Sequence, residues 1–250
     1  SGDSQPIYQE TLELFTAADE LGFDVGWVAE HHFKEVVGRL PSLFPFLAAA
    51  SQCTRRIRLG TAVAILPFEN PVRMAEDAAV VDALSGGRLE LGVGSGLDPG
   101  EFKAYGVEVG QRLEHTTEAL RVLQSALRGE PLGESELRLN PSAPTLADRI
   151  WQSGQSVAGA QYVAKAGSGL LLSRSIIGPS SDEPTDLQQA PTVQAYLDAW
   201  QHPTAKPRIG MSRGIYPAKD KQTALERLRA DVLRLAAAQA SGSALWRENT

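Results

Sequence analysis

The sequence predicts an α/β fold built on a parallel β-sheet, and three observations support this prediction. Strand-like apolar runs alternate along the chain with helical segments, so that a crossover helix separates successive strands. The run from Ile57 to Leu66 is almost continuously apolar, which is typical of a strand covered on both faces. The chain has 250 residues, enough to bury a large core, and we treat residues 1–250 as one domain.

Each element has a local signal. Pro6 begins a helix that Gly22 ends, and Asn70 is an N-cap for a helix that Gly86 ends. We expect strands at residues 24–29, 57–66, 88–93, 149–152, 170–173 and 208–212. We expect helices at residues 6–21, 45–54, 72–84 and 113–127, from about residue 156, around residue 196, and at 221–240. Residues 129–146 and 177–191 are expected to be surface loops.

About six strand–helix units can be counted in this pattern, whereas a closed (β/α)8 barrel has eight. The first recognisable element is a helix, and no strand follows the last long helix. A first and a last strand are therefore expected to be missing from this sequence. An incomplete barrel and a doubly wound open sheet are both compatible with the pattern.

The composition excludes several classes of protein. The net charge of −6 argues against a sequence-independent grip on nucleic acid, which needs a basic surface. No apolar run reaches the length of a membrane span and no signal peptide begins the chain, so we expect a cytoplasmic protein with no membrane partner. The single cysteine, Cys53, excludes an internal disulfide and a cysteine-rich metal site, and its apolar neighbours predict a buried, inert thiol.

Polar residues follow the first predicted strand, at the end where parallel α/β proteins place their active sites. Glu30, His31 and His32 stand there in succession, and histidine is the side chain whose ordinary pKa lies nearest neutrality. Adjacent residues point to opposite faces, so His31 and His32 are poorly placed to bind one metal ion, and we expect no metal site. A surface loop that contains two histidines is the competing interpretation.

Three more strand ends carry unusual residues, and in a barrel all four ends would ring one mouth. They are Thr61-Ala62-Val63, Gly94-Ser95-Gly96 and Ser153-Gly154-Gln155-Ser156. Gly94 and Gly96 would let a flat ligand approach the backbone, although two glycines also suit a tight turn. Gly92, Gly94 and Gly96 do not form a dinucleotide fingerprint, because the spacing is wrong and residues 97–100 are not expected to continue into a helix.

Ser156 begins a predicted helix whose first turn contains Gly159 and no carboxylate. Free N–H groups and a hydroxyl at a helix N-terminus bind phosphate well, but an ordinary serine N-cap has the same sequence. Arg174 and Arg213 each follow a predicted strand on the same rim. Either arginine could bind the phosphate, or form a structural ion pair on the surface.

Several motifs, in one order, resemble the bacterial luciferase family of flavin-dependent monooxygenases. The motifs lie at residues 27–33, 60–63, 66–67, 70–73, 76–77, 84–88, 92, 96–97 and 155–156. The match keeps one register from about Leu12 to Ser173 and is looser as far as Tyr216. Because several motifs occur in a fixed order, the resemblance is more specific than any one of them.

The resemblance implies a (β/α)8 TIM barrel of the bacterial luciferase type, which binds reduced FMN at its C-terminal mouth. It implies that FMN and O2 oxidise a small organic substrate through a C4a-peroxyflavin. A separate NAD(P)H:flavin reductase would supply the reduced FMN, and a homodimer is expected. The alternatives are a non-catalytic flavin-binding protein, an F420-dependent oxidoreductase and, from the histidines alone, a metal-dependent hydrolase.

The resemblance also assigns roles to residues. His31 is the acid or base at the flavin, Glu30 and His32 fix the structure around it, and Ala62-Val63 matches a cis peptide bond packed under the flavin ring. Residues of the cofactor site are then Thr61, Ala62, Val63, Gly94, Ser95, Gln155, Ser156 and Gly159. Gly94 replaces a cysteine of luciferase, which argues against light emission. Ser95 replaces a phosphate-binding arginine, so Arg174 or Arg213 is expected to meet the phosphate charge.

Overall fold

The computed structural model of the chain describes residues 4–33, 39–174 and 183–242. The chain divides into two compact units, Ser1–Met211 and Ser212–Thr250. The first unit contains the sheet, and within its described residues every strand pairing is parallel. Among its described residues, the second contains one helix, α8 (Lys221–Gly242).

The strands lie in the order in which the chain forms them, β1-β2-β4-β5-β6-β7, and β3 also pairs with β4. Their bounds are β1 Val25–Val28, β2 Arg58–Thr61, β3 Ala64–Ile65, β4 Leu89–Gly94, β5 Ile150–Ser153, β6 Gly169–Leu172 and β7 Ile209–Met211. β2 and β3 both pair with β4, so they fill one strand position and the described residues supply six positions of a barrel.

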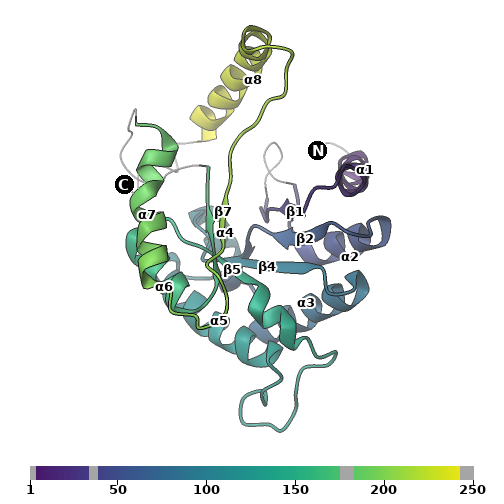
Figure 1. Ribbon diagram of the computed structural model, residues 1–250, viewed down its shortest axis with the longest axis vertical. Helices are drawn as coiled ribbons and strands as arrows, with labels where there is room; N and C mark the ends of the chain where they lie inside the picture. Colours follow the sequence, from purple (N-terminus) through teal and green to yellow (C-terminus); the bar gives the residue numbers. More distant parts are fainter. Residues whose placement is uncertain (1–3, 34–38, 175–182, 243–250) are drawn as a thin grey trace. The chain divides into compact units, whose positions relative to one another are not determined.

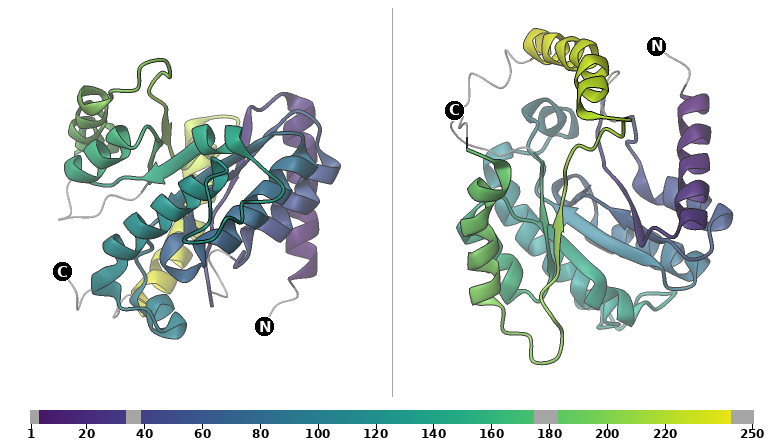
Figure 2. Two further views of the ribbon diagram at one scale, coloured as in Figure 1. Left: turned by 90° about the horizontal axis from the view of Figure 1, so that it is seen from below. Right: turned by 45° about the horizontal axis from the view of Figure 1, so that its top comes forward.

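Helices connect the strands and cover the outer face of the sheet (Figures 1 and 2). The α-helices of the first unit are α1 Gln5–Leu21, α2 Leu43–Cys53, α3 Pro71–Ser85, α4 Pro99–Tyr105, α5 Arg112–Leu127, α6 Val157–Lys165 and α7 Thr185–Ala199. The short 3-10 helices are η1 Leu66–Phe68, η2 Val109–Gln111 and η3 Pro144–Arg149.

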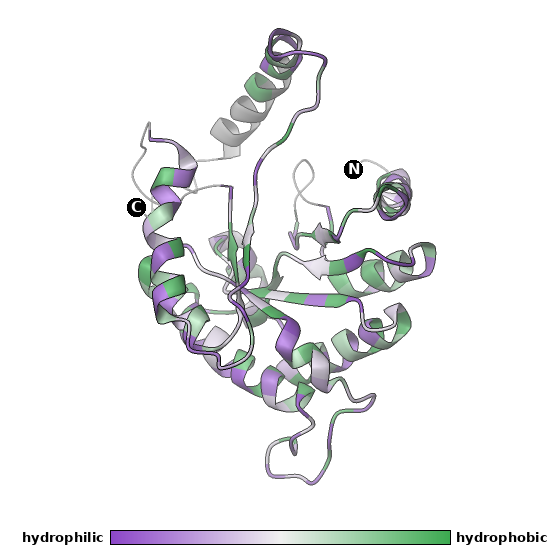
Figure 3. Ribbon diagram, in the orientation of Figure 1, coloured by the Kyte–Doolittle hydropathy of each residue, from purple (hydrophilic) through white to green (hydrophobic). Residues whose placement is uncertain are grey.

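The sheet curls into part of a barrel, which confirms the predicted α/β fold class. A doubly wound sheet reverses its strand order at a switch point, whereas here spatial order follows chain order throughout. The apolar layer lies between the sheet and the helices, and Figure 3 shows apolar residues gathered on α2 and α3. One buried cluster joins α1, α2, α3 and α5 to β1 through β5, and a smaller one joins α6 and α7 to β6.

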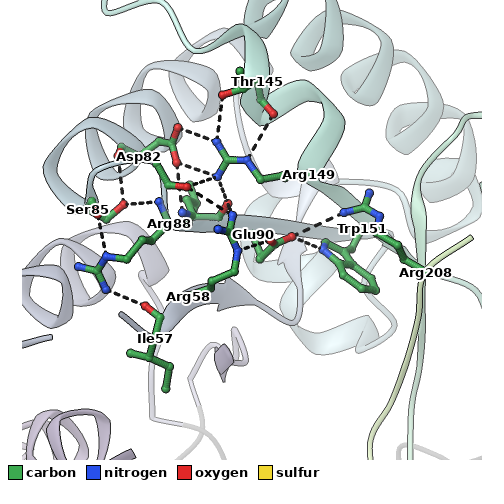
Figure 4. Close-up of polar contacts among 12 residues, drawn as sticks. Ile57, Arg58, Asp82, Ser85, Arg88, Glu90, Thr145, Arg149, Trp151 and Arg208 are labelled. Atoms are coloured by element: carbon green, nitrogen blue, oxygen red, sulfur yellow. Dashed lines mark hydrogen bonds and ion pairs between the residues drawn. The ribbon is translucent and has the colours of Figure 1, made fainter. Parts of the chain in front are cut away.

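The inner face of the sheet carries a polar cluster toward its N-terminal end. The buried Glu90 carboxylate accepts hydrogen bonds from Arg58 and from the Trp151 indole, and Arg208 lies 3.7 Å from it (Figure 4). The Arg208 guanidinium also lies 4.7 Å from the centre of the Trp151 ring, and Trp27 packs edge-on against Trp151. These side chains fill the bottom of the half-barrel and leave its C-terminal edge for a site.

Most elements lie where the sequence predicts them, but three predictions are wrong. The strand expected at 57–66 stops at Thr61, resumes at Ala64 and turns into η1 at Leu66, where Pro67 lacks the N–H that a ladder needs. The loop expected at 177–191 lies partly outside the described residues, and α7 already begins at Thr185. That helix tolerates Pro191 because it buries Gln189, Thr192 and Tyr196.

The third correction concerns residues 97–100, which the sequence does not predict to continue into a helix. Here α4 begins at Pro99, and the Asp98 carboxylate caps it by accepting hydrogen bonds from the N–H groups of Gly100 and Glu101. Cys53 is also misjudged, because it ends α2 on the exposed side of the helix while Leu47 and Ala50 are buried. No helix among the described residues is long and apolar enough to cross a membrane.

Candidate active site

The four polar strand ends lie along one edge of the half-barrel. Because β1, β2, β4 and β5 are parallel and adjacent, the residues that follow them meet at their common C-terminal edge. This edge therefore carries Glu30, His31 and His32 after β1, Ala62-Val63 after β2, Gly94 at the end of β4, and Gln155-Ser156 after β5.

The two adjacent histidines have different surroundings. His31 is exposed, and its backbone N–H donates to the Leu40 carbonyl. His32 is only 4% exposed, and both of its ring nitrogens have partners: Nε2 lies 2.7 Å from Glu30 Oε1, and Nδ1 lies 2.9 Å from the Tyr105 hydroxyl. Its backbone N–H donates to the buried Glu101 carboxylate. The structure therefore presents His31 at the edge and anchors His32 beneath it.

Glu30 connects the end of β1 to β3. One carboxylate oxygen contacts His32, and the other accepts a hydrogen bond from the Ile65 N–H at 3.2 Å. Burial raises the pKa of this carboxyl above its ordinary value, and the hydrogen bond and charge of His32 only partly offset that effect. Glu30 is thus a buried acid that holds a proton more readily than an exposed glutamate.

The Ala62–Val63 peptide bond is cis, as the resemblance implies. The Ala62 N–H donates to the Val28 carbonyl at 2.7 Å, which attaches this turn to the end of β1. Both Ala62 and Val63 are half-buried, so they present apolar surface at the edge. Thr61 is completely buried, and its hydroxyl donates to the Gly92 carbonyl and accepts from the Gly92 N–H. The structure gives this hydroxyl a role in joining β2 to β4.

Gly94 and Gly96 have packing reasons that need no ligand. A Cβ on Gly94 would lie 2.6 Å from Val63 Cγ2 and 2.8 Å from Ser153 Oγ. A Cβ on Gly96, whose φ is +66°, would lie 2.8 Å from Ile65 Cγ2. The Val63 side chain therefore fills the space over Gly94, and a flat ligand at this point would meet Val63.

Ser156 is the N-cap of α6, and its hydroxyl accepts a hydrogen bond from the Gly159 N–H at 3.1 Å. The first turn is exposed as far as Ala158 and contains no acidic residue. Gln155 and Ser95 are half-buried on the loops beside this edge. Arg174 is exposed just after β6. Arg213 belongs to the second unit, where it donates to the Ser212 carbonyl.

Sequence reasoning missed two residues of the His32 cluster, Glu101 and Tyr105, because it missed α4. They are four residues apart and so share one face of that helix. The Tyr105 ring stacks on the Phe68 ring, with 4.5 Å between their centres. Burial raises the pKa of Tyr105, and the nearby carboxylates raise it further. The signal was present, since Asp98-Pro99 resembles the Asn70-Pro71 start that correctly predicts α3.

Among the described residues, no group of three or more histidine, cysteine, aspartate or glutamate side chains is arranged to hold a metal ion. A parallel half-barrel with its polar cluster at the C-terminal strand ends defines a protein of the TIM-barrel class. Residues 1–250 match the family of luciferase-like monooxygenases, and the chain belongs to that family.

Individual relatives agree with this assignment. The chain is 40% identical over 119 residues to 4-hydroxyprotoasukamycin monooxygenase of Streptomyces nodosus subsp. asukaensis. The matched segment covers 48% of this chain and 32% of that protein. The matched part spans about a third of the length of this and two similar curated relatives.

Solved structures share the fold. Monooxygenase RslO1 from Streptomyces bottropensis is 28% identical with a TM-score of 0.78, over 97% of this chain and 77% of that one. The oxygenating constituent of 3,6-diketocamphane monooxygenase from Pseudomonas putida, in complex with FMN, is 18% identical with a TM-score of 0.71. That alignment covers 91% of this chain and 67% of the other, and it shows similarity of fold alone.

Proposed function

We propose that this protein is a flavin-dependent monooxygenase that uses reduced FMN and O2 to oxidise a small organic substrate. Membership of the luciferase-like monooxygenase family supports an oxidoreductase of this kind. The observation that carries the choice of FMN is the exposed first turn of α6, which contains no acidic residue and lies at the same strand edge as Ala62-Val63. A neighbour of the same fold is described in complex with FMN.

The residues at this edge fit an FMN phosphate. The N-terminal turn of α6 is exposed as far as Ala158 and carries a partial positive charge, and the turn itself contains no carboxylate that would oppose an anion. Ser156 and Gly159 would lie closest to the phosphate, with Gln155 beside them. We propose Arg174, exposed after β6, as the cation that balances its charge, since Ser95 carries none.

The same edge fits a flat ring. Ala62 and Val63 are half-buried and apolar, and Val63 covers the Gly94 backbone. We propose that the isoalloxazine ring would lie against these two residues. When bound, reduced FMN would supply the two electrons that insertion of one oxygen atom from O2 into a substrate requires.

His31 is the side chain that we propose to move protons at this site. It is exposed at the edge, and its neighbours Glu30 and His32 fix the backbone on either side. Because an imidazole acts as acid or base near neutral pH, His31→Ala is expected to lower turnover far more than affinity for reduced FMN. Equal losses in both would contradict this role, and rapid-mixing kinetics with a binding titration measure the two quantities.

Anaerobic binding titrations test the choice of cofactor. We expect photoreduced FMN to bind tightly and reduced F420 to bind more weakly. Absorbance and fluorescence measure both titrations. Preference for F420 would favour the F420-dependent alternative, and binding of FMN without oxidation of any substrate would favour a non-catalytic flavin-binding protein. In the proposed function a separate NAD(P)H:flavin reductase supplies the reduced FMN.

We also propose that the protein forms a homodimer through α2 and α3. Val80 and Leu84 on α3 are 44% and 52% exposed, so this helix carries apolar side chains on its outer side. Val80→Glu is expected to convert a dimer to monomers in analytical ultracentrifugation. A wild-type protein that sediments as a monomer at micromolar concentration would contradict the proposal.

A further inference from the structure

Two buried side chains and one exposed side chain form a continuous hydrogen-bonded chain behind the strand edge. Glu30 Oε1 lies 2.7 Å from His32 Nε2, and His32 Nδ1 lies 2.9 Å from the Tyr105 hydroxyl. Glu30 and His32 are 6% and 4% exposed, whereas Tyr105 is 41% exposed. The chain therefore runs from a buried carboxyl, through an imidazole, to a hydroxyl near the surface.

The buried end of this chain meets a cavity of about 320 Å³ between α2 and α3. Glu30 lines it together with Glu69, Arg73 and Asp77, and its remaining lining residues include Ser42 and Pro45. The cavity is polar and much larger than one water molecule, so it can hold water beside Glu30. The two ends of the chain thus face different surroundings.

We propose that Glu30, His32 and Tyr105 form a proton relay, which carries a proton from water in the α2–α3 cavity to an acceptor at the Tyr105 hydroxyl. Its use in oxygen chemistry rests on the proposed function, but its existence depends only on these three side chains. His31 lies on the exposed side of the same segment, so the relay would supply protons beside it.

The two contacts allow two protonation states with the same heavy-atom positions. In the first, Glu30 is ionised and accepts from His32 Nε2–H, and His32 Nδ1 accepts from the Tyr105 hydroxyl. In the second, Glu30 is protonated and donates to Nε2, and Nδ1–H donates to the Tyr105 oxygen, whose own proton points outward. The heavy-atom distances fit both states equally.

Passage from the second state to the first moves one proton outward. The Tyr105 O–H bond breaks as its proton passes to the acceptor, and the Nδ1 proton of His32 forms a new O–H bond on Tyr105. The Glu30 proton then forms the new Nε2–H bond. Glu30 is left ionised and recovers its proton from water in the cavity, so one proton enters and one leaves. The His32 ring then turns over and the Tyr105 hydroxyl rotates outward, which restores the second state before the next proton passes.

The surrounding charges favour a proton on Glu30. Burial and the nearby Glu69 raise the pKa of Glu30, and burial and Asp77 raise the pKa of Glu69 itself. Arg73 is engaged on the surface by Glu76 and Asp77. On the other side, Glu101 accepts from the His32 backbone N–H and repels negative charge on Tyr105. Tyr105 therefore stays a hydroxyl and passes protons without ionising for long.

A cluster that only fixes the backbone would keep one hydrogen-bond arrangement, whereas a relay must exchange its protons. Nitrogen-15 NMR of histidine-labelled protein distinguishes these cases and needs no flavin, and His32→Gln assigns the signals. We expect His32 to change from the Nδ1–H to the Nε2–H tautomer as rising pH removes the proton from Glu30, whose pKa is raised by burial. In Glu30→Gln the change should be absent, because the amide does not titrate. One His32 tautomer throughout the wild-type titration would overturn the relay.

Turnover with reduced FMN provides the second readout. Tyr105→Phe keeps the ring on Phe68 but removes the outlet, and it is expected to lower kcat by about 10- to 100-fold and alter its pH profile. Tyr162→Phe, on α6 and similarly exposed, is the matched control and should behave as wild type. A wild-type rate and pH profile in Tyr105→Phe would overturn the relay. If the wild type oxidises no substrate, the proposed function fails, and the NMR titration alone decides the relay.

Discussion

At the scale of single residues, the polar side chains of the strand edge divide into those that face the edge and those that support it. His31 is exposed, whereas Glu30 and His32 are buried and bonded to each other. The alternation of side chains along an extended chain predicts that neighbours face opposite ways. It does not predict which histidine is buried, because that depends on Tyr105, which is 73 residues away.

A substitution at Thr61 tests whether its hydroxyl stabilises the fold or binds the cofactor. Its hydroxyl forms two buried hydrogen bonds with Gly92, so Thr61→Val leaves the Gly92 N–H without its partner. We expect a loss of about 1–3 kcal/mol in the free energy of unfolding, measured with urea, and an affinity for reduced FMN close to wild type. Unchanged stability with a large loss of affinity would instead place the hydroxyl at the cofactor.

The raised pKa of Glu30 makes a prediction about stability and pH. A carboxyl whose pKa is higher in the folded protein contributes stability that is fully present below its ordinary value, 4.5, and is lost as pH rises through the raised value. The unfolding free energy of Glu30→Gln should therefore fall less above pH 4.5 than that of the wild type. Part of the fall should remain in this variant, because the pKa of Glu69 is also raised. Urea titrations at several pH values measure this, and an unaltered slope would show that Glu30 ionises normally.

At the scale of elements, α6 offers the clearest separation of folding from binding. Ser156→Asp keeps an N-cap but places a negative charge where we propose the phosphate, so unfolding should stay near wild type. Affinity for FMN is expected to fall at least about tenfold, which corresponds to about 1.4 kcal/mol. Riboflavin, which has no phosphate, is the control ligand, and an equal loss for both ligands would show that Ser156 does not contact the phosphate.

The sequence predicts most helices and strands because their end signals are local. Asn70 and Gly86 bound α3 through caps that the structure contains. The same reasoning failed at α4, because residues 97–100 were not expected to continue into a helix although Asp98 supplies a proper cap. It also failed at α7, where burial of one helix face outweighs the cost of an internal Pro191. Tertiary packing decides such cases, and local sequence does not contain it.

The site was less predictable than the fold. Strand ends locate Glu30, Ala62 and Ser156 at one edge, because adjacent parallel strands end together. The sequence does not show why residues 94 and 96 are glycines. In the structure, the absence of a side chain at these positions makes room for Val63 and Ile65 and does not leave open space. The role of each of these glycines therefore depends on contacts with residues of other segments, which the local sequence does not show.

At the scale of the whole first unit, the Glu90 cluster connects strands that are distant in sequence. Arg58 comes from β2, Trp151 from β5, and Arg208 immediately precedes β7. Glu90→Gln leaves both arginines without their charged partner, and we expect it to lower the free energy of unfolding by about 1–3 kcal/mol. Glu118→Gln, which breaks an exposed pair with Arg121 on α5, is the matched control and should lower it much less. Equal effects in urea unfolding would mean that the Glu90 cluster contributes no more than a surface pair.

The measurement that tests the account most directly is a rapid mixing of the protein with photoreduced FMN and then with aerated buffer. If the strand edge binds reduced flavin and manages its reaction with O2, the protein should bind FMN before mixing. A transient absorbing species should then precede reoxidation, and the Ser156→Asp variant should show less of it at the same FMN concentration. Failure of the wild-type protein to bind FMN in either redox state would contradict the proposed function and leave only the fold.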